Sequence, residues 1–390
     1  MASAAEPEVL EEAFGPVRVV TLNRPKALNA LNTPMMKQLA RTLRNWEARP
    51  HARVIILKGA GPPGRAYCAG GDVRAVYEMG KAGRHEECKQ FFRWEYNVNN
   101  FLAEMQKPVI AWMDGVTMGG GCGVSINGPI RIATENTVCA MPECAIGLHP
   151  DVGASWFLNH RSPLLRDSSI GMYLALTGAR LDGANMVALG LATHWMPSER
   201  LPLLIERLGA LRDFSRDGIE SVLYEITERP TVDQADPNVS ILARRKVIDE
   251  CFANYSVEHI IGALRKAARE PGNKWVEDIL ASMQKASPTS LKITHRSIER
   301  GRSLTLSKAL KTEFRLTYRC LEKPDFYEGV RAMLVDKDMK PKWQPKALTE
   351  VKAGEVAWYA SPLPEGEELE FELEKMLAEA AAKNAPTAKL

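Results

Sequence analysis

Short apolar runs and longer periodic segments alternate along the first sixty residues. Residues 17–22 are β-branched and precede Asn-Arg-Pro, which predicts a strand that ends in a turn. Thr33-Pro34 supplies an N-cap and a first-turn proline, and the apolar residues of 36–46 recur at helical spacing. The continuous apolar run 54–57 is typical of a strand covered on both faces. This order predicts a parallel βαβ unit.

Glycine and proline punctuate the next hundred residues. The segment 59–71 is rich in both and predicts a loop, after which one helix is expected from Asp72 and a longer one over 85–105. The triple glycine 119–121 leads into an apolar segment that we expect to begin a buried helix. Further strands are predicted at 108–113, 130–133 and 138–141.

Beyond about residue 151 the pattern becomes mostly helical. Residues 228–238 are rich in proline and aspartate and predict a connecting loop, while 365–383 predicts a terminal helix, either docked or solvated. The pattern therefore indicates an α/β core followed by a mostly helical region. The expected helices lie near 162–177, 182–190, 197–213, 240–253, 256–268, 274–285, 288–299 and 304–321.

Composition excludes several classes of protein. The formal net charge of +3 over 390 residues does not demand a nucleic-acid partner, and no apolar run is long enough to span a bilayer. The cysteines number seven and form no Cys-x-x-Cys pair, so neither a disulfide framework nor a thiolate zinc site is expected. We expect no metal and no membrane association.

The two ends of the chain bear on its location in the cell. The acidic N-terminus has no apolar centre and resembles neither a secretory signal nor an Arg-rich transit peptide. The last three residues, Ala388-Lys389-Leu390, are similar to the peroxisomal address Ser-Lys-Leu. They predict a peroxisomal location and the peroxisomal import receptor as a partner. The alternative is a chance tripeptide on a protein of the mitochondrion or cytosol.

Two glycine-rich segments could present backbone N–H groups to a ligand. Cys68-Ala-Gly-Gly-Asp72 precedes a predicted helix, where uncovered N–H groups can hold an oxyanion. Gly119-Gly120-Gly121 permits a close approach to a ligand, and no Lys-Ser or Lys-Thr follows to make it a Walker sequence. Each segment is equally compatible with a plain turn packed against the sheet.

Carboxylates supply the remaining candidate chemistry. Glu143 and Asp151 stand eight residues apart in a loop full of proline and glycine, and such a pair can divide acid and base work. A solvated turn for Glu143 and an N-cap for Asp151 are the plainer interpretations. Glu95 lies on a predicted helix, where a solvent-facing position is the ordinary one, and His149 could serve as a base.

In their order and spacing these segments resemble the crotonase superfamily over at least residues 15–200. The resemblance rests on Asn23–Leu31, Cys68–Asp72, Gly115–Gly121 and Pro142-Glu143. Within the superfamily the chain is similar to the branch that hydrolyses short, branched hydroxyacyl-CoA thioesters. Segments 92–96, 150–153, 176–182, 190–194, 286–292 and 328–338 carry that second likeness, which reaches about Pro345.

The resemblance implies a crotonase-type ββα spiral core followed by a mostly helical C-terminal region. It places the core with the CoA thioester site in 1–200, packed helices in 201–345 and a tail in 346–390. It also implies that the amides of Gly71 and Gly120 hold the thioester oxygen. Glu95, Glu143 and Asp151 lie on the acyl side, and Lys26, in the turn that meets coenzyme A, could touch a phosphate.

One contrast favours hydrolysis over hydration. Hydratases of the superfamily carry a second glutamate where this chain has Gly123, and usually glycine where it has Asp151. The resemblance therefore implies thioester hydrolysis on an acyl-CoA substrate, with no cofactor besides the coenzyme A of that substrate. His149 departs from the aromatic residue that is common in this branch. An enoyl-CoA hydratase or isomerase, a non-catalytic RNA- or ribosome-associated relative, and a homo-oligomer all stay open.

Overall fold

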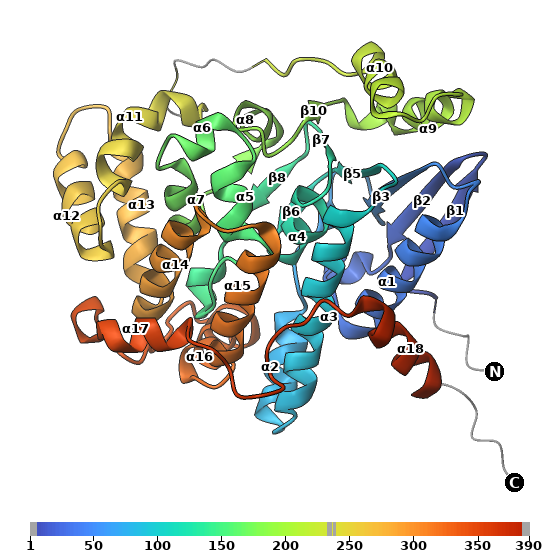
Figure 1. The fold of residues 1–390 in the computed structure, drawn as a ribbon. Coiled ribbons are helices and arrows are strands. Elements are labelled where there is room, and N and C mark those ends of the chain that lie inside the picture. Colours follow the sequence, from blue (N-terminus) through green and yellow to red (C-terminus); the bar gives the residue numbers. More distant parts are fainter. Residues whose placement is uncertain (1–5, 232–235, 237–238, 384–390) are drawn as a thin grey trace, which may run out of the picture.

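The computed structural model describes residues 6–231, 236 and 239–383 (Figure 1). It confirms the predicted βαβ unit, because β2 (Val17–Leu22) and β3 (Val54–Gly59) pair in parallel and α1 (Thr33–Ala48) connects them. The predicted N-cap is wrong by one residue. Asn32 caps α1, and its side chain accepts a hydrogen bond of 2.8 Å from the N–H of Met35.

Within the described residues, the strands form two sheets. The larger has the order β1-β2-β3-β5-β7-β10 and the smaller β4-β6-β8-β9. Each of the consecutive pairs β3–β4, β5–β6 and β7–β8 gives one strand to each sheet before helices follow, which confirms the ββα spiral. The remaining strands are β1 (Val9–Phe14), β4 (Ala66–Cys68), β5 (Val109–Met113), β6 (Val116–Met118), β7 (Ile130–Ala133), β8 (Val138–Ala140), β9 (Leu181–Asp182) and β10 (His194–Trp195).

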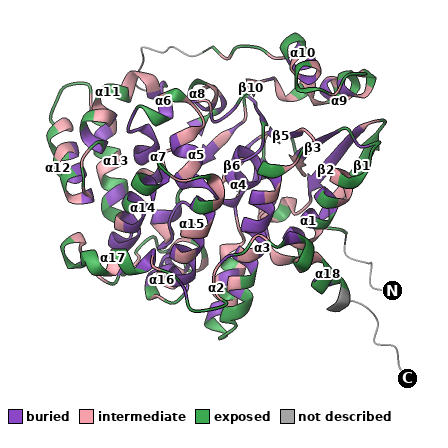
Figure 2. Ribbon diagram, in the orientation of Figure 1, coloured by how far each residue is buried: buried purple, intermediate pink, exposed green. Residues whose placement is uncertain are grey.

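The large sheet is covered on both faces, as the apolar run of β3 predicts. Val54 and Ile56 face one core with α9 (Leu201–Ala210) and α10 (Arg216–Ile226), while Ile55 and Leu57 face the main core. Successive side chains of a strand point to opposite faces, so the run 54–57, which lies between two cores, is apolar at every position. Figure 2 shows the central strands as largely buried.

The helices that follow the first strands lie where the sequence places them. They are α2 (Val73–Lys81), capped by Asp72, α3 (His85–Glu104) and α4 (Gly120–Ile126). Sequence patterns miss β1, because five of its six residues are not buried and it shows no alternation. They also miss the three-residue strands β4 and β6, although the equally short β8 lies within the strand predicted at 138–141.

The helical region reaches back to the core. Helix α14 packs on α5 and α7, and α15 packs on α3 and α5. The single helix expected over 162–177 is two helices, separated by Asp167–Ser169. These helices are α5 (Ala154–His160), α6 (Pro163–Arg166), α7 (Ile170–Thr177), α8 (Gly183–Ala188), α11 (Ile241–Phe252), α12 (Val257–Ala267), α13 (Lys274–Lys285), α14 (Pro288–Gly301), α15 (Leu306–Cys320) and α16 (Pro324–Val330).

The last described segment is docked. Helix α17 (Ala353–Tyr359) packs on α14, and α18 (Leu373–Lys383), which begins eight residues later than the pattern predicts, packs on α1 and α3 (Figure 1). On α3, Arg93 donates hydrogen bonds of 2.6 and 2.7 Å to the carbonyls of Glu367 and Glu368. The domain boundaries at 200 and 345 stay predictions, and Ala388-Lys389-Leu390 lies outside the described residues.

No helix among the described residues is long and apolar enough to cross a membrane.

Candidate active site

The two predicted glycine loops meet in the structure. A bridge joins Leu31 to Gly71 through the carbonyl of Gly70 and the N–H of Asp72, which leaves the N–H of Gly71 outside it. Gly120 opens α4, so its N–H has no acceptor within the helix. A Cβ added to Gly120 would lie 3.2 Å from the nitrogen of Gly71. The two amides therefore lie side by side, although they come from separate loops.

Two predicted acids reach these glycines. A Cβ on Gly120 would lie 2.2 Å from Oε1 of Glu95, and one on Gly119 would lie 2.8 Å from Oε1 of Glu143. Glu95 comes from the inner face of α3, whereas Glu143 opens a 3-10 turn, η2 (Glu143–Ile146), directly after β8. The loops and the carboxyl groups are thus one cluster, although up to 72 residues separate its members.

Burial makes this cluster electrostatically unusual. Glu95, Glu143 and Asp151 are only 2%, 6% and 4% exposed. Oε1 of Glu95 and Oε2 of Glu143 have no hydrogen-bond partner among the described residues. A buried carboxylate without a partner is costly, so each of these oxygens is a candidate for contact with a ligand or water.

The pKa values of the three acids are all raised. Burial raises the pKa of Glu143 well above its usual range, and the charges of Asp151 and Glu95 add to that effect. Burial and then the charge of Asp151 do the same to the pKa of Glu95. Burial raises the pKa of Asp151 to about 7, against the opposing hydrogen bond from Tyr96. Three carboxyl groups that are buried together repel one another when ionised. The site therefore favours states in which fewer than three of them are charged.

Asp151 is held by residues that sequence reasoning missed. The hydroxyl of Tyr96 donates a 2.6 Å hydrogen bond to Oδ2 of Asp151, and Thr317 lies 2.9 Å beyond that hydroxyl. The loop after Asp151 is held by Glu313, whose carboxyl accepts hydrogen bonds of 2.7 and 2.8 Å from the N–H groups of Gly153 and Ser155. Tyr96 follows Glu95, which is a usable signal, whereas no local pattern identifies Thr317 or Glu313.

Gly123 leaves no room for the second glutamate of a hydratase. A Cβ there would lie 2.6 Å from Cβ of Val152 and 2.9 Å from both amide atoms of Asn99. Those two atoms are buried and have no partner among the described residues. The space that a longer side chain would need is therefore filled by Asn99 and by the turn that carries Asp151.

Lys26 lies apart from the acids. It is exposed in the 3-10 turn η1 (Pro25–Ala27), which is joined to the first glycine loop by a 3.0 Å hydrogen bond from the N–H of Ala69 to the carbonyl of Leu28. Its exposed position is compatible with a phosphate contact and equally with a solvated lysine.

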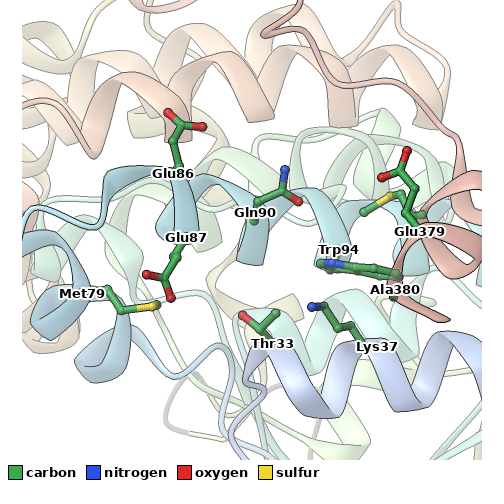
Figure 3. Close-up of a pocket in the computed structure, with 10 residues that line it drawn as sticks. Thr33, Lys37, Met79, Glu86, Glu87, Gln90, Trp94, Glu379 and Ala380 are labelled. Atoms are coloured by element: carbon green, nitrogen blue, oxygen red, sulfur yellow. The ribbon is translucent and has the colours of Figure 1, made fainter. Parts of the chain in front are cut away.

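A separate surface pocket of about 360 Å³ opens between α1, α3 and α18 (Figure 3). Lys37 and Trp94 face each other there, with the ammonium 5.7 Å from the ring centroid. The residues that line it include none of the three buried acids. No cluster of three or more side chains suited to a metal is present among the described residues.

The family model for enoyl-CoA hydratase/isomerase matches residues 17–360. The chain belongs to this family. It is 45% identical to the mitochondrial 3-hydroxyisobutyryl-CoA hydrolase of Mus musculus over 344 residues, which cover 88% of this chain and 86% of the mouse protein. It is 43% identical to 3-hydroxyisobutyryl-CoA hydrolase 1 of Arabidopsis thaliana, over 91% and 92% of the two chains.

A solved member of the family has the same fold. The crystal structure of a carnitinyl-CoA dehydratase from Mycobacterium thermoresistibile superposes with a TM-score of 0.82 at 36% identity, over 94% of this chain and 99% of the other. The crotonase-type fold expected from the sequence is thereby confirmed. The curated relatives are named as hydrolases, whereas this solved neighbour is named as a dehydratase.

Proposed function

We propose that this chain hydrolyses 3-hydroxyisobutyryl-CoA to 3-hydroxyisobutyrate and coenzyme A. The observation that carries the proposal is the carboxyl of Glu143, buried beside Gly119 with one oxygen that has no hydrogen-bond partner in the described part of the chain. The mouse and Arabidopsis proteins, named for this thioester, support the same substrate. Valine breakdown is the role that their name implies.

The thioester carbonyl binds between the N–H groups of Gly71 and Gly120. Negative charge develops on its oxygen as the carbon becomes tetrahedral, and two fixed amides in a dry site stabilise that charge more than water does. The short approach between the two loops supports this role, since a Cβ added to Gly120 would lie 3.2 Å from the nitrogen of Gly71.

Glu143 faces the same carbon and starts the reaction by one of two routes. Its carboxylate attacks the carbonyl carbon to give a mixed anhydride that water then opens, or it takes a proton from a water that attacks directly. In both routes the C–S bond breaks, its electron pair leaves with sulfur, and one water is consumed. A single turnover in ¹⁸O water that labels the Glu143 carboxyl would support the anhydride.

Asp151 and Glu95 act on the acyl group and the leaving group. Asp151 binds the substrate hydroxyl and supplies a proton to the departing sulfur, while Glu95 supports the hydroxyl or the water. A site built to hydrogen-bond a hydroxyl rejects analogues that lack it by about 10⁴-fold or more. We therefore expect a strong preference for hydroxyacyl over plain acyl thioesters.

The experiment is the substitution Glu143→Gln, which keeps size and polarity but removes the carboxyl group that acts as nucleophile or base. We expect thiol release from 3-hydroxyisobutyryl-CoA to fall by about 10²–10⁴-fold. Glu104→Gln, at the exposed end of α3, is the matched control and should keep wild-type activity. Hydrolysis by the Glu143→Gln variant near the wild-type rate would refute the assignment.

A hydratase is the competing reaction within the family. The crowding around Gly123 disfavours it, because hydration across a double bond needs two carboxylates above one substrate plane. Crotonyl-CoA distinguishes the two: we expect no measurable hydration under conditions in which the hydroxyacyl thioester is cleaved.

Cofactor and location are further proposals. A carboxylate, two amides and water balance the reaction, so activity should survive dialysis against a chelator. The peroxisome and its import receptor rest on Ala388-Lys389-Leu390 alone. The mouse relative is mitochondrial by name and supports the mitochondrion. Imaging of the chain with and without these three residues tests the peroxisomal address.

A further inference from the structure

A chain of four short polar contacts runs behind Asp151. Nδ1 of His149 lies 3.0 Å from the carbonyl oxygen of Pro150, and Nε2 lies 3.0 Å from Oγ1 of Thr317. Oγ1 of Thr317 lies 2.9 Å from the hydroxyl of Tyr96, which lies 2.6 Å from Oδ2 of Asp151. His149, Thr317 and Tyr96 are completely buried, so each contact must hold a proton or carry a penalty.

The protons of the chain do not suffice when Asp151 is ionised. The Pro150 carbonyl can only accept, so Nδ1 of His149 must carry a proton. In a neutral imidazole Nε2 then accepts, and the hydroxyl proton of Thr317 goes to it. The single hydroxyl proton of Tyr96 can serve Thr317 or Asp151, but not both. These four contacts therefore share three protons, and the Glu313 carbonyl that also faces the His149 ring can only accept and supplies none.

A fourth proton completes the chain, and it can sit at either end. On Asp151 it is donated to Tyr96, which reverses the direction of the 2.6 Å hydrogen bond that the ionised carboxyl accepts, and every contact onward to Pro150 then has one proton. On His149 it makes an imidazolium, which the nearby carbonyls of Pro150 and Glu313 favour. Burial of the ring outweighs them and lowers the pKa of His149 to about 4, whereas that of Asp151 is raised to about 7. The proton belongs on Asp151.

We infer that His149 and Thr317 are positioning residues that act through Tyr96 to keep a proton on Asp151 and so make it the acid for the leaving thiolate. The inference rests on the proposed hydrolase function. When the C–S bond breaks, the proton of Asp151 moves to sulfur and forms the thiol. The Tyr96 hydroxyl then rotates from Thr317 to the new carboxylate, and the Thr317 hydroxyl turns from His149 to Tyr96. The attacking water returns one proton to Asp151.

Several other charged groups face Asp151 and act on the same proton. The carboxyls of Glu95, Glu143 and Glu313 all favour the protonated form of Asp151 by repulsion when ionised. These three carboxyls are present in all of the variants below. A difference in the pH profile between variants therefore reports on the contacts among His149, Thr317, Tyr96 and Asp151. The facing titratable groups are Glu95 and Tyr96 from α3, Glu143 from η2, Glu313 and Cys320 from α15, and His149.

The test is the pH profile of kcat for hydrolysis of 3-hydroxyisobutyryl-CoA, followed by the loss of thioester absorbance. His149→Phe frees Thr317 to donate to Tyr96, and Tyr96 to donate to ionised Asp151. Thr317→Val likewise leaves Tyr96 free for ionised Asp151. Both substitutions should move the alkaline limb down by about one pH unit, the equivalent of one hydrogen bond.

Tyr96→Phe should move the same limb up by about one pH unit, because the ionised carboxyl loses its charge-assisted donor. Thr312→Val, a partly exposed position on the same helix as Thr317, is the matched control and should leave the profile unchanged. A uniform loss of kcat with no opposed shifts would mean a structural role only and would overturn the inference.

Nitrogen NMR of protein with labelled histidine tests the inference without measuring thioester cleavage, so it can fail or succeed independently of the proposed function. At pH 6 we expect the signal that disappears in His149→Phe to be a neutral imidazole protonated at Nδ1. An imidazolium, or a ring protonated only at Nε2, overturns the inference whether or not the thioester is cleaved. If the wild type does not cleave the thioester, the proposed function fails while this measurement still decides the state of the chain.

Discussion

Replacing Gly120 by alanine adds one methyl group at the narrowest point of the site. The new Cβ would lie 2.2 Å from Oε1 of Glu95 and 3.2 Å from the nitrogen of Gly71. Gly120 has an ordinary helical backbone, so alanine introduces no strain in φ. The consequence is therefore local: the methyl group occupies the space in which the thioester oxygen would meet the two amides.

The size of the effect follows from these distances. A carbon–oxygen contact of 2.2 Å is about 1 Å too short, so the Glu95 carboxyl must move by roughly that distance. A displacement of about 1 Å at a reacting centre can cost about 10²-fold. Loss of one oxyanion donor costs about 10²–10³-fold, or about 2.7–4 kcal/mol. We expect kcat/KM to fall by about 10²–10³-fold.

The assay compares Gly120→Ala with Gly128→Ala by thiol release and by thermal unfolding. Residue 128 lies just past α4, and its added Cβ would meet its nearest neighbour, the carbonyl oxygen of Ser125, at 3.4 Å. The control should keep its activity. Overpacking at residue 120 lowers the free energy of unfolding by about 1–3 kcal/mol. Both variants are therefore assayed at a temperature well below their midpoints of thermal unfolding. Activity of Gly120→Ala within threefold of wild type, with an intact fold, would contradict the placement of the thioester oxygen.

Two predictions concern stability. Burial raises the pKa of Asp151 from 3.8 to about 7. The contribution of this carboxyl to the free energy of unfolding is therefore complete below about pH 4, and it is lost as the pH rises through 7. Asp151→Asn should therefore be more stable than wild type at pH 8, by up to about 4 kcal/mol, and equal near pH 4; urea unfolding that shows the opposite trend refutes the sign. Glu313→Ala leaves the amides of Gly153 and Ser155 without their acceptor and should cost about 2–5 kcal/mol. An unchanged unfolding midpoint would show that water replaces the carboxyl.

The main strands and helices could be predicted locally because their signals are local. The apolar run of β3 and the helical spacing of α1 each lie within one element, and the structure confirms both. Asn32 rather than Thr33 caps α1, a difference that depends on where the preceding turn ends. In the second sheet, β8 is predicted from residues 138–141, whereas β4 and β6 are not; each of these pairs with neighbouring strands that lie far away in the sequence.

The features of the candidate site also fall into those that the sequence predicts and those that only the tertiary structure determines. Sequence alone indicated the residue types, namely two glycine loops and the acids Glu95, Glu143 and Asp151, because the family places them in motifs. Tertiary structure alone decided which amides and carboxyls meet, which oxygens stay unpartnered, and that Thr317 and His149, 168 residues apart, share a hydrogen bond. The physical reason is that chemical identity is a property of each residue, whereas burial and proton sharing depend on atoms that distant segments bring together.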